Sequence, residues 1–167
     1  KELVLIGGGH SHVAVLRSFA MRPITGVRLT LICRDVHTPY SGMLPGYLAG
    51  HYSYDEAHID LAKLCQFAGV RFINDEVSGI DPRDKTLSFA SLRPDMCFDV
   101  LSINTGSAPR VQSVKGAAEY SVPVKPISQF LQRWSRLLER LDKGTKNVSV
   151  VVVGAGWCCC WWCCSCC

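Results

Sequence analysis

The sequence predicts an α/β fold: a parallel sheet with helices on both faces and a small β-hairpin excursion. Two observations support this prediction. Short apolar runs alternate with longer amphipathic ones, which is typical of parallel sheets. In addition, an apolar run followed at once by a glycine loop occurs at Gly7 and again at Gly154. The 167 residues, 48% apolar and 19% charged, suffice for a folded domain with its own core.

The first elements are predicted from periodicity and from the residues that end them. A compact apolar run leads directly into three glycines, and the amphipathic segment after them ends at Pro23 and Gly26. The next apolar run is hydrophobic enough to lie inside a sheet covered on both faces. The predicted order is strand Glu2–Ile6, loop Gly7–Gly9, helix His12–Met21 and strand Val27–Cys33.

Beyond residue 52 the alternation of short apolar runs and longer amphipathic runs continues. Residues 36–52 are rich in Gly, Pro and Tyr and are predicted to be irregular. The turn Asp81-Pro82-Arg83-Asp84 predicts a hairpin. Beyond residue 52 the predicted order is helix Tyr54–Ala68, strand Val70–Ile73, hairpin strands Glu76–Ile80 and Thr86–Ala90, strand Cys97–Ile103, helix Ile127–Leu141 and strand Val148–Val153.

Charge and cysteine usage narrow the classes of function. The net charge is +4 with Lys and Arg scattered, so we expect no nucleic-acid partner. Only Cys33, Cys65 and Cys97 precede residue 158, without metal-ligand spacing. We therefore expect no metal site and a reduced, intracellular protein of the cytoplasm or an organelle. The chain begins with Lys1 and shows no targeting signal, which predicts that the natural start lies upstream.

The glycines between the first strand and the first helix predict a site for a diphosphate. In Gly7-Gly8-Gly9 the first glycine permits the tight turn, and the next two let the backbone approach phosphate oxygens. Free N–H groups at His10 and Ser11 then face the anion. The full Gly-x-Gly-x-x-Gly pattern has glycine where His12 stands, so a looser or rotated helix start is expected. We interpret both histidines as residues beside the ligand; a purely structural turn is the alternative.

The end of the second strand should hold an acidic side chain for the adenosine ribose. Cys33 occupies that position, and a thiol is a poor acceptor. Asp35 is close enough in sequence to reach the ribose, and Arg34 could stack on adenine. The alternative is that Asp35 only caps a turn.

Three stretches carry a resemblance to a known family. They are Gly7-Gly8-Gly9-His10-Ser11-His12, then Thr38-Pro39-Tyr40-Ser41-Gly42-Met43-Leu44-Pro45-Gly46, then Asp99-Val100-Leu101-Ser102-Ile103-Asn104-Thr105-Gly106-Ser107-Ala108-Pro109. Over about the first 156 residues, the chain resembles the FAD-dependent pyridine nucleotide-disulfide oxidoreductase family. The likeness is greatest to the branch related to type II NADH dehydrogenases, especially members fused to selenide, water dikinase.

The resemblance implies a Rossmann-like FAD- and NAD(P)-binding fold and assigns further site residues. Thr105-Gly106-Ser107 is similar to the family's second flavin motif, and the strand near Val77 to the one whose backbone contacts adenine. Pro45 lies in the second resembling stretch. Gly154 and Gly156 resemble the start of the NAD(P)H-binding domain. The cofactor-binding residues expected are Gly7, Gly8, Gly9, His10, Ser11, Arg34, Asp35, Pro45, Val77, Thr105, Gly106 and Ser107 for FAD, and Gly154 and Gly156 for NAD(P)H.

The activity implied is hydride transfer from NAD(P)H to FAD and then to a small-molecule acceptor such as a quinone. For the longer protein, the resemblance also implies peripheral membrane contact and a fused selenide, water dikinase domain. Dithiol members carry a Cys-x4-Cys pair, whereas Tyr40–Tyr47 contains no cysteine, so we expect no disulfide reduction. No acid–base residue is assigned. The alternatives are an NAD(P)-dependent reductase with a single dinucleotide fold, or a non-catalytic nucleotide-binding fragment.

The repeat of the glycine loop predicts the domain organisation. Residues 1–146 form the N-terminal portion of an FAD-binding domain, and residues 147–156 the first strand and loop of an NAD(P)H-binding domain. Residues 157–167 contain only Trp, Cys and one Ser. Gly and Ala codons GGT and GCT read as TGG and TGC when the frame slips, so we interpret this tail as a frame error. A metal-binding cysteine cluster or a membrane-seeking tail is the alternative. The chain of 167 residues alone is expected to be inactive.

Overall fold

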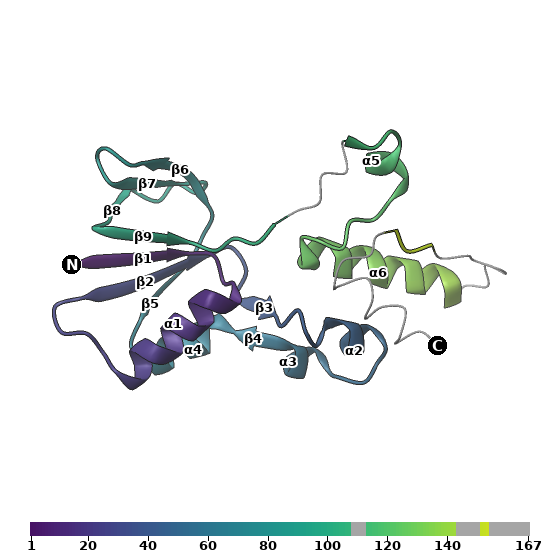
Figure 1. The fold of residues 1–167 in the computed structure, drawn as a ribbon, viewed down its shortest axis with the longest axis horizontal. Helices are drawn as coiled ribbons and strands as arrows, with labels where there is room; N and C mark the ends of the chain where they lie inside the picture. Colours follow the sequence, from purple (N-terminus) through teal and green to yellow (C-terminus); the bar gives the residue numbers. More distant parts are fainter. Residues whose placement is uncertain (108–112, 143–150, 154–167) are drawn as a thin grey trace. The chain divides into compact units, whose positions relative to one another are not determined.

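The α/β prediction is confirmed by the structure. The computed structural model describes residues 1–107, 113–142 and 151–153, and the chain divides into two compact units, residues 1–105 and 106–167. The first unit is built on a four-stranded parallel sheet in the order β5-β2-β1-β9 (Figure 1). Two small antiparallel sheets accompany it, β3-β4 and the three-stranded β6-β7-β8.

The first unit contains four helices and nine strands among its described residues. Its helices are α1 (His10–Met21), α2 (Leu44–Leu48), α3 (Tyr54–Ala57) and α4 (Leu61–Ala68). Its strands are β1 (Glu2–Ile6), β2 (Arg28–Cys33), β3 (His37–Pro39), β4 (His58–Asp60), β5 (Arg71–Asn74), β6 (Val77–Asp81), β7 (Thr86–Phe89), β8 (Met96–Cys97) and β9 (Val100–Ile103).

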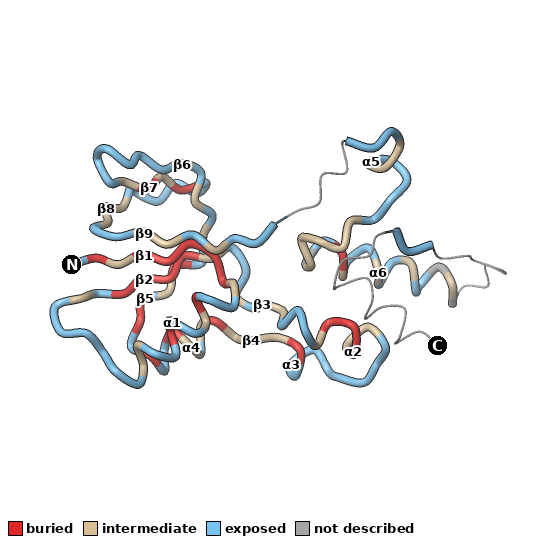
Figure 2. The backbone as a smooth tube through the Cα atoms, viewed as in Figure 1, coloured by how far each residue is buried: buried red, intermediate tan, exposed pale blue. Residues whose placement is uncertain are grey.

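Alternate residues of the parallel strands supply two separate cores, one on each face of the sheet. On one face, Leu5 and Leu31 pack with Leu16 of α1 and with α4. On the other, Val4 packs with Leu87 of the β6–β8 sheet. The buried backbone accordingly runs through the middle strands and the facing sides of the helices (Figure 2). Within residues 1–105, the second face therefore carries a β-sheet, where helices were expected on both faces.

The segment Tyr54–Ala68 is not the single helix that its apolar spacing predicts. Ser53 and Glu56 form a reciprocal cap that begins α3, and His58–Asp60 then becomes β4, paired with β3. The Asp60 side chain accepts a hydrogen bond from the Lys63 amide at 2.9 Å and so begins α4. Because two caps lie within eight residues, the chain forms two short helices separated by an extended turn. Residues 36–52, predicted to be irregular, contain β3 and α2.

The predicted strand Cys97–Ile103 is split between two sheets. The Phe98 amide donates to the Lys85 carbonyl at 2.9 Å, within the β6–β8 sheet. The next amide, of Asp99, donates to the Glu2 carbonyl at 2.9 Å, alongside β1. Two consecutive donors directed to different sheets force the backbone to change direction there. The hairpin predicted through Asp81–Asp84 is confirmed and gains β8 as a third strand.

The second unit contains α5 (Ala117–Tyr120) and α6 (Ile127–Asp142) in its described part. The helix predicted over Ile127–Leu141 is confirmed, and Phe130 is buried with its ring stacked 6.2 Å from that of Trp134. Of the predicted strand Val148–Val153, only residues 151–153 are described, and they form neither helix nor strand. Gly154, Gly156 and the Trp/Cys tail lie outside the described residues, so the predicted domain boundary at 146 stays a prediction.

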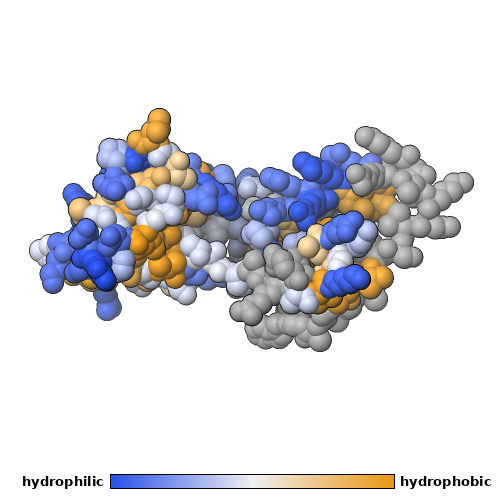
Figure 3. Space-filling model, turned by 90° about the horizontal axis from the view of Figure 1, so that it is seen from above, coloured by the Kyte–Doolittle hydropathy of each residue, from blue (hydrophilic) through white to orange (hydrophobic). Residues whose placement is uncertain are grey.

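The surface of the described residues is mixed in character. In the space-filling view from above, apolar patches are bordered by hydrophilic side chains (Figure 3). Leu92 and Phe67 are among the large apolar side chains left exposed. None of the described helices is long and apolar enough to cross a bilayer.

The acidic residues that fix strand and helix ends make stability depend on pH. Hydrogen bonds from the Lys63 amide to Asp60 and from the Glu2 amide to Asp99 lower the pKa of each carboxyl below its ordinary 3.8. A carboxyl whose pKa is lower in the folded state stabilises the fold above its unfolded pKa. That contribution is lost as the pH falls through the lowered folded value.

We therefore expect the free energy of unfolding in urea to fall as the pH drops below about 4. Asp60→Asn should flatten this acid slope, because the amide still caps α4 but does not titrate. Urea titrations at several acidic pH values would measure both slopes. Identical acid slopes in the two proteins would contradict the role assigned to Asp60.

Candidate functional site

The glycine loop is held against the ends of three parallel strands. The Gly7 amide donates to the Ile32 carbonyl at 2.8 Å, and the Asn104 amide donates to the Ile6 carbonyl at 2.8 Å. Gly7 turns with φ +93°, and a Cβ at that position would lie 2.3 Å from the Asn104 carbonyl oxygen. Only glycine is compatible with both the backbone angle and this contact. The structure thus brings the loop beside Asn104 and Thr105 at the end of β9.

A Cβ at either of the next two glycines would also come close to side chains of the protein. A Cβ on Gly8 would lie 2.5 Å from Leu61 Cδ1, and one on Gly9 would lie 2.4 Å from the Asn104 side chain. Side chains at these positions would push the loop away from α4 and β9. The three glycines therefore let the loop approach α4 and the end of β9 closely.

The first turn of α1 leaves three backbone donors unused. Gly9 is the N-cap of the helix, and no side chain caps it. The amides of His12 and Val13 both donate to the Gly9 carbonyl. Among the described residues, the amides of Gly9, His10 and Ser11 have no acceptor, because the first N–H groups of a helix have no intrahelical partner. Three such donors at the positive end of a helix dipole form a site for an anion.

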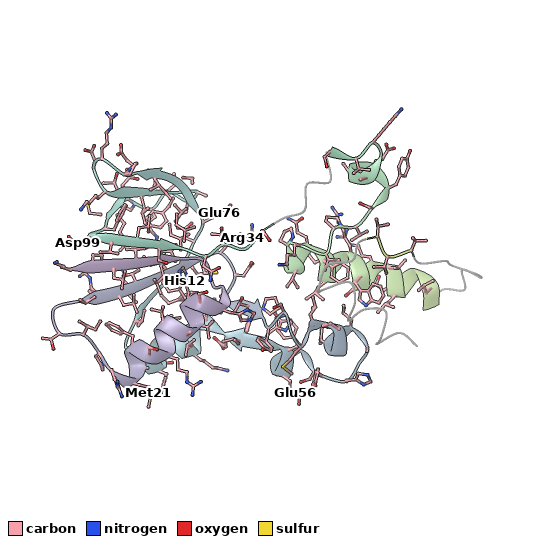
Figure 4. All side chains as sticks on the ribbon, in the orientation of Figure 1. His12, Met21, Arg34, Glu56, Glu76 and Asp99 are labelled. Atoms are coloured by element: carbon pink, nitrogen blue, oxygen red, sulfur yellow. The ribbon has the colours of Figure 1, made fainter. Side chains whose placement is uncertain are left out.

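His12 lies in the interior, where the full glycine pattern has no side chain. It is 2% exposed, with Nδ1 2.7 Å from the Gly7 carbonyl oxygen and Nε2 2.9 Å from Ser102 Oγ. A carbonyl can only accept, so Nδ1 carries the hydrogen and Nε2 of the neutral ring accepts from Ser102. The imidazole joins the glycine loop to β9 and lies between α1 and the sheet (Figure 4). This internal role was not predicted from the sequence, in which His12 was interpreted as a residue beside the ligand.

Cys33 occupies the end of β2, where an acidic residue was expected. Burial raises the pKa of its thiol, against hydrogen bonds to the sulfur from the Asp35 and Gly8 amides that lower it. Its neighbours Arg34 and Asp35 lie 3.5 Å apart and are about half exposed. The two polar groups available for a ribose or an adenine at this strand end are therefore a guanidinium and a carboxylate that contact each other.

Asn74, at the end of β5, is a site residue that sequence reasoning missed. Its amide Nδ2 donates to the Cys33 carbonyl at 3.0 Å and to the Arg34 carbonyl at 2.7 Å. These bonds fix the backbone that presents Arg34. The signal available was a polar residue at the carboxyl end of a parallel strand, where ligands bind in such sheets.

Some of the other predicted FAD residues lie near the glycine loop, at the carboxyl ends of the parallel strands, and others lie elsewhere. Tyr40 makes an edge contact with His10, with ring centroids 4.9 Å apart, and so connects the end of β3 to the glycine loop. Pro45 is buried in α2, and Val77 opens β6. Thr105 lies beside the loop, whereas Gly106 and Ser107 belong to the second unit. The roles proposed for Gly154 and Gly156 fall outside the described residues.

A group of aromatic side chains beyond β3 was also not predicted. Tyr54 stacks on His58 with ring centroids 3.8 Å apart, and the Tyr47 ring meets both edge-on. His58 Nδ1 is 2.8 Å from the Tyr54 carbonyl oxygen and donates to it. Burial of the Tyr54 ring is the largest of the causes that raise its pKa. The stacking depends on the break between α3 and β4, which apolar spacing does not reveal.

The cysteines of the described part of the chain are free thiols, one of them deeply buried. Cys33, Cys65 and Cys97 are free thiols there, and burial raises the pKa of Cys65 to about 11. A thiol with that pKa is almost fully protonated at neutral pH and is a poor nucleophile. Within residues 1–107, 113–142 and 151–153, no three His, Cys, Asp or Glu side chains are grouped to hold a metal ion.

Comparison with known proteins decides the family. The profile of the pyridine nucleotide-disulphide oxidoreductase family matches residues 1–165. The chain belongs to this family. No curated protein matches the chain.

Solved structures share the fold of this family member at low identity. Sulfide:quinone oxidoreductase from Aquifex aeolicus matches with a TM-score of 0.65 and 24% identity, over 86% of this chain and 33% of that one. NDH2 from Plasmodium falciparum, in complex with NADH, matches with a TM-score of 0.71 and 18% identity, over 89% and 31%. CoADR-RHD from Bacillus anthracis matches with a TM-score of 0.67 and 18% identity, over 84% and 27%. The chain spans about a third of the length of these proteins.

Proposed function

We propose that the glycine loop and the first turn of α1 bind the diphosphate of FAD. The observation that carries the proposal is the set of three unused amides at Gly9, His10 and Ser11. A diphosphate has the charge and the acceptor oxygens that such donors require. Gly7 and Gly8 fit the same ligand, because they keep Cβ atoms out of a loop already in contact with β9 and α4.

Other residues near the carboxyl ends of the parallel strands would hold the remaining parts of the ADP half. Asn74 fixes the backbone of Arg34, whose planar guanidinium is suited to stacking on adenine. Asp35 offers the carboxylate for the ribose hydroxyls, because the Cys33 thiol is a poor acceptor. The backbone at Val77 would contact adenine, and that of Pro45, Thr105, Gly106 and Ser107 the flavin half. His12 keeps the loop at a fixed distance from β9 through Gly7 and Ser102.

The reaction that we propose is oxidation of NAD(P)H with passage of the hydride to an acceptor such as a quinone. When bound, FAD would accept the hydride from NAD(P)H and pass the electrons on, which amino-acid side chains cannot do. Family membership supports this class of reaction. The names of two structural neighbours, a sulfide:quinone oxidoreductase and an NDH2 solved with NADH, favour a quinone and NADH. Gly154 and Gly156 would bind NAD(P)H, and no catalytic side chain is assigned.

Flavin titration tests the proposal. FAD and FMN share the isoalloxazine ring, but only FAD carries the diphosphate and adenosine for which this edge is suited. We expect FAD to bind at least about tenfold more tightly than FMN, measured by quenching of flavin fluorescence. Equal affinities for FAD and FMN, or no saturable binding of either, would overturn the proposal.

One observation favours a second candidate, an NADPH-dependent reductase with a single dinucleotide fold. A neutral residue at the end of β2 followed by an arginine, as in Cys33-Arg34, suits the 2′-phosphate of NADPH. Adding NADPH to the same titration separates the two readings. Displacement of FAD from this edge by NADPH with higher affinity would favour the second candidate.

Further expectations from the sequence and from the resemblance stay predictions. They concern peripheral membrane contact and a fused selenide, water dikinase domain in the longer protein, the intracellular location, and the frame error in residues 157–167. The frame error has a direct test: the transcript should show a slip near codon 157. An in-frame Trp/Cys run would refute it.

A further inference from the structure

A cavity lies toward the amino ends of β2 and β5, away from the glycine loop. It has a volume of about 380 Å³ and is formed between the amino ends of β2 and β5 and the chain that joins β7 to β8. Asp99 marks this end of the sheet in Figure 4, whereas Arg34 and Glu76 mark the end that carries the proposed FAD site. Small-molecule sites have volumes of roughly 300–1,000 Å³, so the cavity is large enough for a small organic ligand.

The cavity combines an apolar floor with a cationic rim. Ile73, Phe89 and Met96, all in or packed against the core beneath the β6–β8 sheet, supply the apolar side chains. The charged residues that line it are Arg28, Arg71, Arg93 and Asp95.

The register of the parallel sheet explains why charged residues gather here. Thr30 pairs with Arg71 across β2 and β5, so the two side chains lie on the same face. Arg28 is two residues before Thr30 and lies on that face as well. Thr30 donates to the buried Glu2 carboxylate at 2.6 Å. The face of the parallel sheet that the β6–β8 sheet covers is thus apolar near the carboxyl ends of the parallel strands and polar near their amino ends.

The carboxylates that pair with two of these arginines lie on the inner side. Glu2 binds Arg28 Nε, with the side chain of Glu2 only 10% exposed and that of Arg28 72% exposed. Asp75 lies 3.3 Å from Arg93 Nε, and their side chains are 9% and 41% exposed. Each pair therefore buries its anion and presents its cation to solvent.

Arg71 differs from the other two arginines because it has no counter-ion. Within the described residues, no carboxylate lies within 4.0 Å of its guanidinium. The other two are already engaged: Arg28 pairs with Glu2 through Nε, and the Arg93 guanidinium pairs with Asp75 and lies over the Phe89 ring, 5.7 Å from its centroid. Arg71 therefore offers planar N–H donors that have no carboxylate acceptor among the described residues.

We propose that this cavity binds a small organic carboxylate with an apolar body. A guanidinium donates two parallel hydrogen bonds to a carboxylate, which gives both charge and orientation. The body of the ligand would lie on Ile73 and Met96, because the Arg93 guanidinium already covers one face of the Phe89 ring. Arg71 would be the main anchor. Because Asp95 disfavours a high anionic charge, a monoanion fits better than a phosphate. The Arg71 anchor is at the amino end of β5, whereas the proposed FAD site is at the carboxyl ends of the parallel strands.

Calorimetric titration of the complete chain with phenylacetate tests the proposal. Phenylacetamide is the neutral isostere, and inorganic phosphate is the anion without an apolar body. We expect saturable binding of phenylacetate and at least about tenfold weaker binding of the other two. Arg71→Met, which keeps an apolar stem, should weaken phenylacetate binding at least about tenfold, and Arg71→Gln should do the same.

Arg83→Met is the matched control, because Arg83 is exposed in the β6–β7 turn outside the cavity and should leave binding unchanged. A thermal melt of each variant checks that it is folded. Equal binding of phenylacetamide, equal binding of phosphate, or unchanged affinity in folded Arg71→Met and Arg71→Gln would overturn the proposal. So would the absence of saturable binding to the parent chain.

Discussion

Replacing Gly7 by alanine should lower the free energy of unfolding by about 3 kcal/mol, measured by urea titration. Two costs add at this position. Alanine is strained at φ +93°, and its Cβ would lie 2.3 Å from the Asn104 carbonyl oxygen, which belongs to the backbone and cannot rotate away. Relief requires the loop and the end of β9 to separate, so FAD binding should weaken as well.

Gly26→Ala is the matched control for this substitution. Gly26 has a similar backbone angle, φ +77°, but nothing lies within 4 Å of a Cβ there. Gly26→Ala should therefore lower the free energy of unfolding only by the cost of the backbone angle, about 1 kcal/mol. Equal losses for the two variants would contradict the close packing of the loop against β9.

Replacing His12 by alanine should lower the free energy of unfolding by about 2 kcal/mol. The substitution leaves a cavity between α1 and the sheet, and it deprives the Gly7 carbonyl and the Ser102 hydroxyl of their partner. It also frees the glycine loop from β9, so FAD affinity should fall in the same variant. Urea titration and flavin titration measure the two effects.

A double-mutant cycle with Ser102→Ala isolates the hydrogen bond between His12 and Ser102. We expect a coupling of about 1 kcal/mol, because the two side chains are in direct contact at 2.9 Å. His51→Ala, at an exposed histidine, controls for loss of an imidazole and should change stability little. Additive losses for His12→Ala and Ser102→Ala would show that the contact contributes nothing.

The parallel sheet and the glycine loop that follows β1 could be predicted from the sequence, because each depends on local signals. The apolar run Glu2–Ile6 matches β1 residue for residue, and the three glycines follow it as expected. The hairpin through Asp81–Asp84 was given by its turn residues. These features rest on spacing and turn chemistry, which a single sequence displays directly.

The features that could not be predicted depend on contacts between distant residues. The break of Tyr54–Ala68 into α3, β4 and α4 requires pairing with β3, some twenty residues away. His12 could be read as a departure from the glycine pattern, but its bond to Ser102 joins residues 90 positions apart. Asn74 reaches across 41 and 40 positions to the backbone at Cys33 and Arg34. Local patterns carry no information about such pairs.

The amide of His10 offers the most direct test of the diphosphate site. His10 is the first residue of α1, where proline is well tolerated, and Gly9 before it is extended at φ −67° and ψ 163°, as proline requires. His10→Pro therefore removes one proposed phosphate donor and leaves the helix intact. His10→Ala is the matched control, because it loses the same ring contact with Tyr40 but keeps the amide.

The decisive measurement is the FAD dissociation constant of these two variants, with equal thermal midpoints as the check on folding. Loss of one hydrogen bond to a charged phosphate predicts that His10→Pro binds FAD about tenfold more weakly than His10→Ala. Equal affinities in two equally stable variants would contradict the claim that the amides of the first turn of α1 bind the diphosphate.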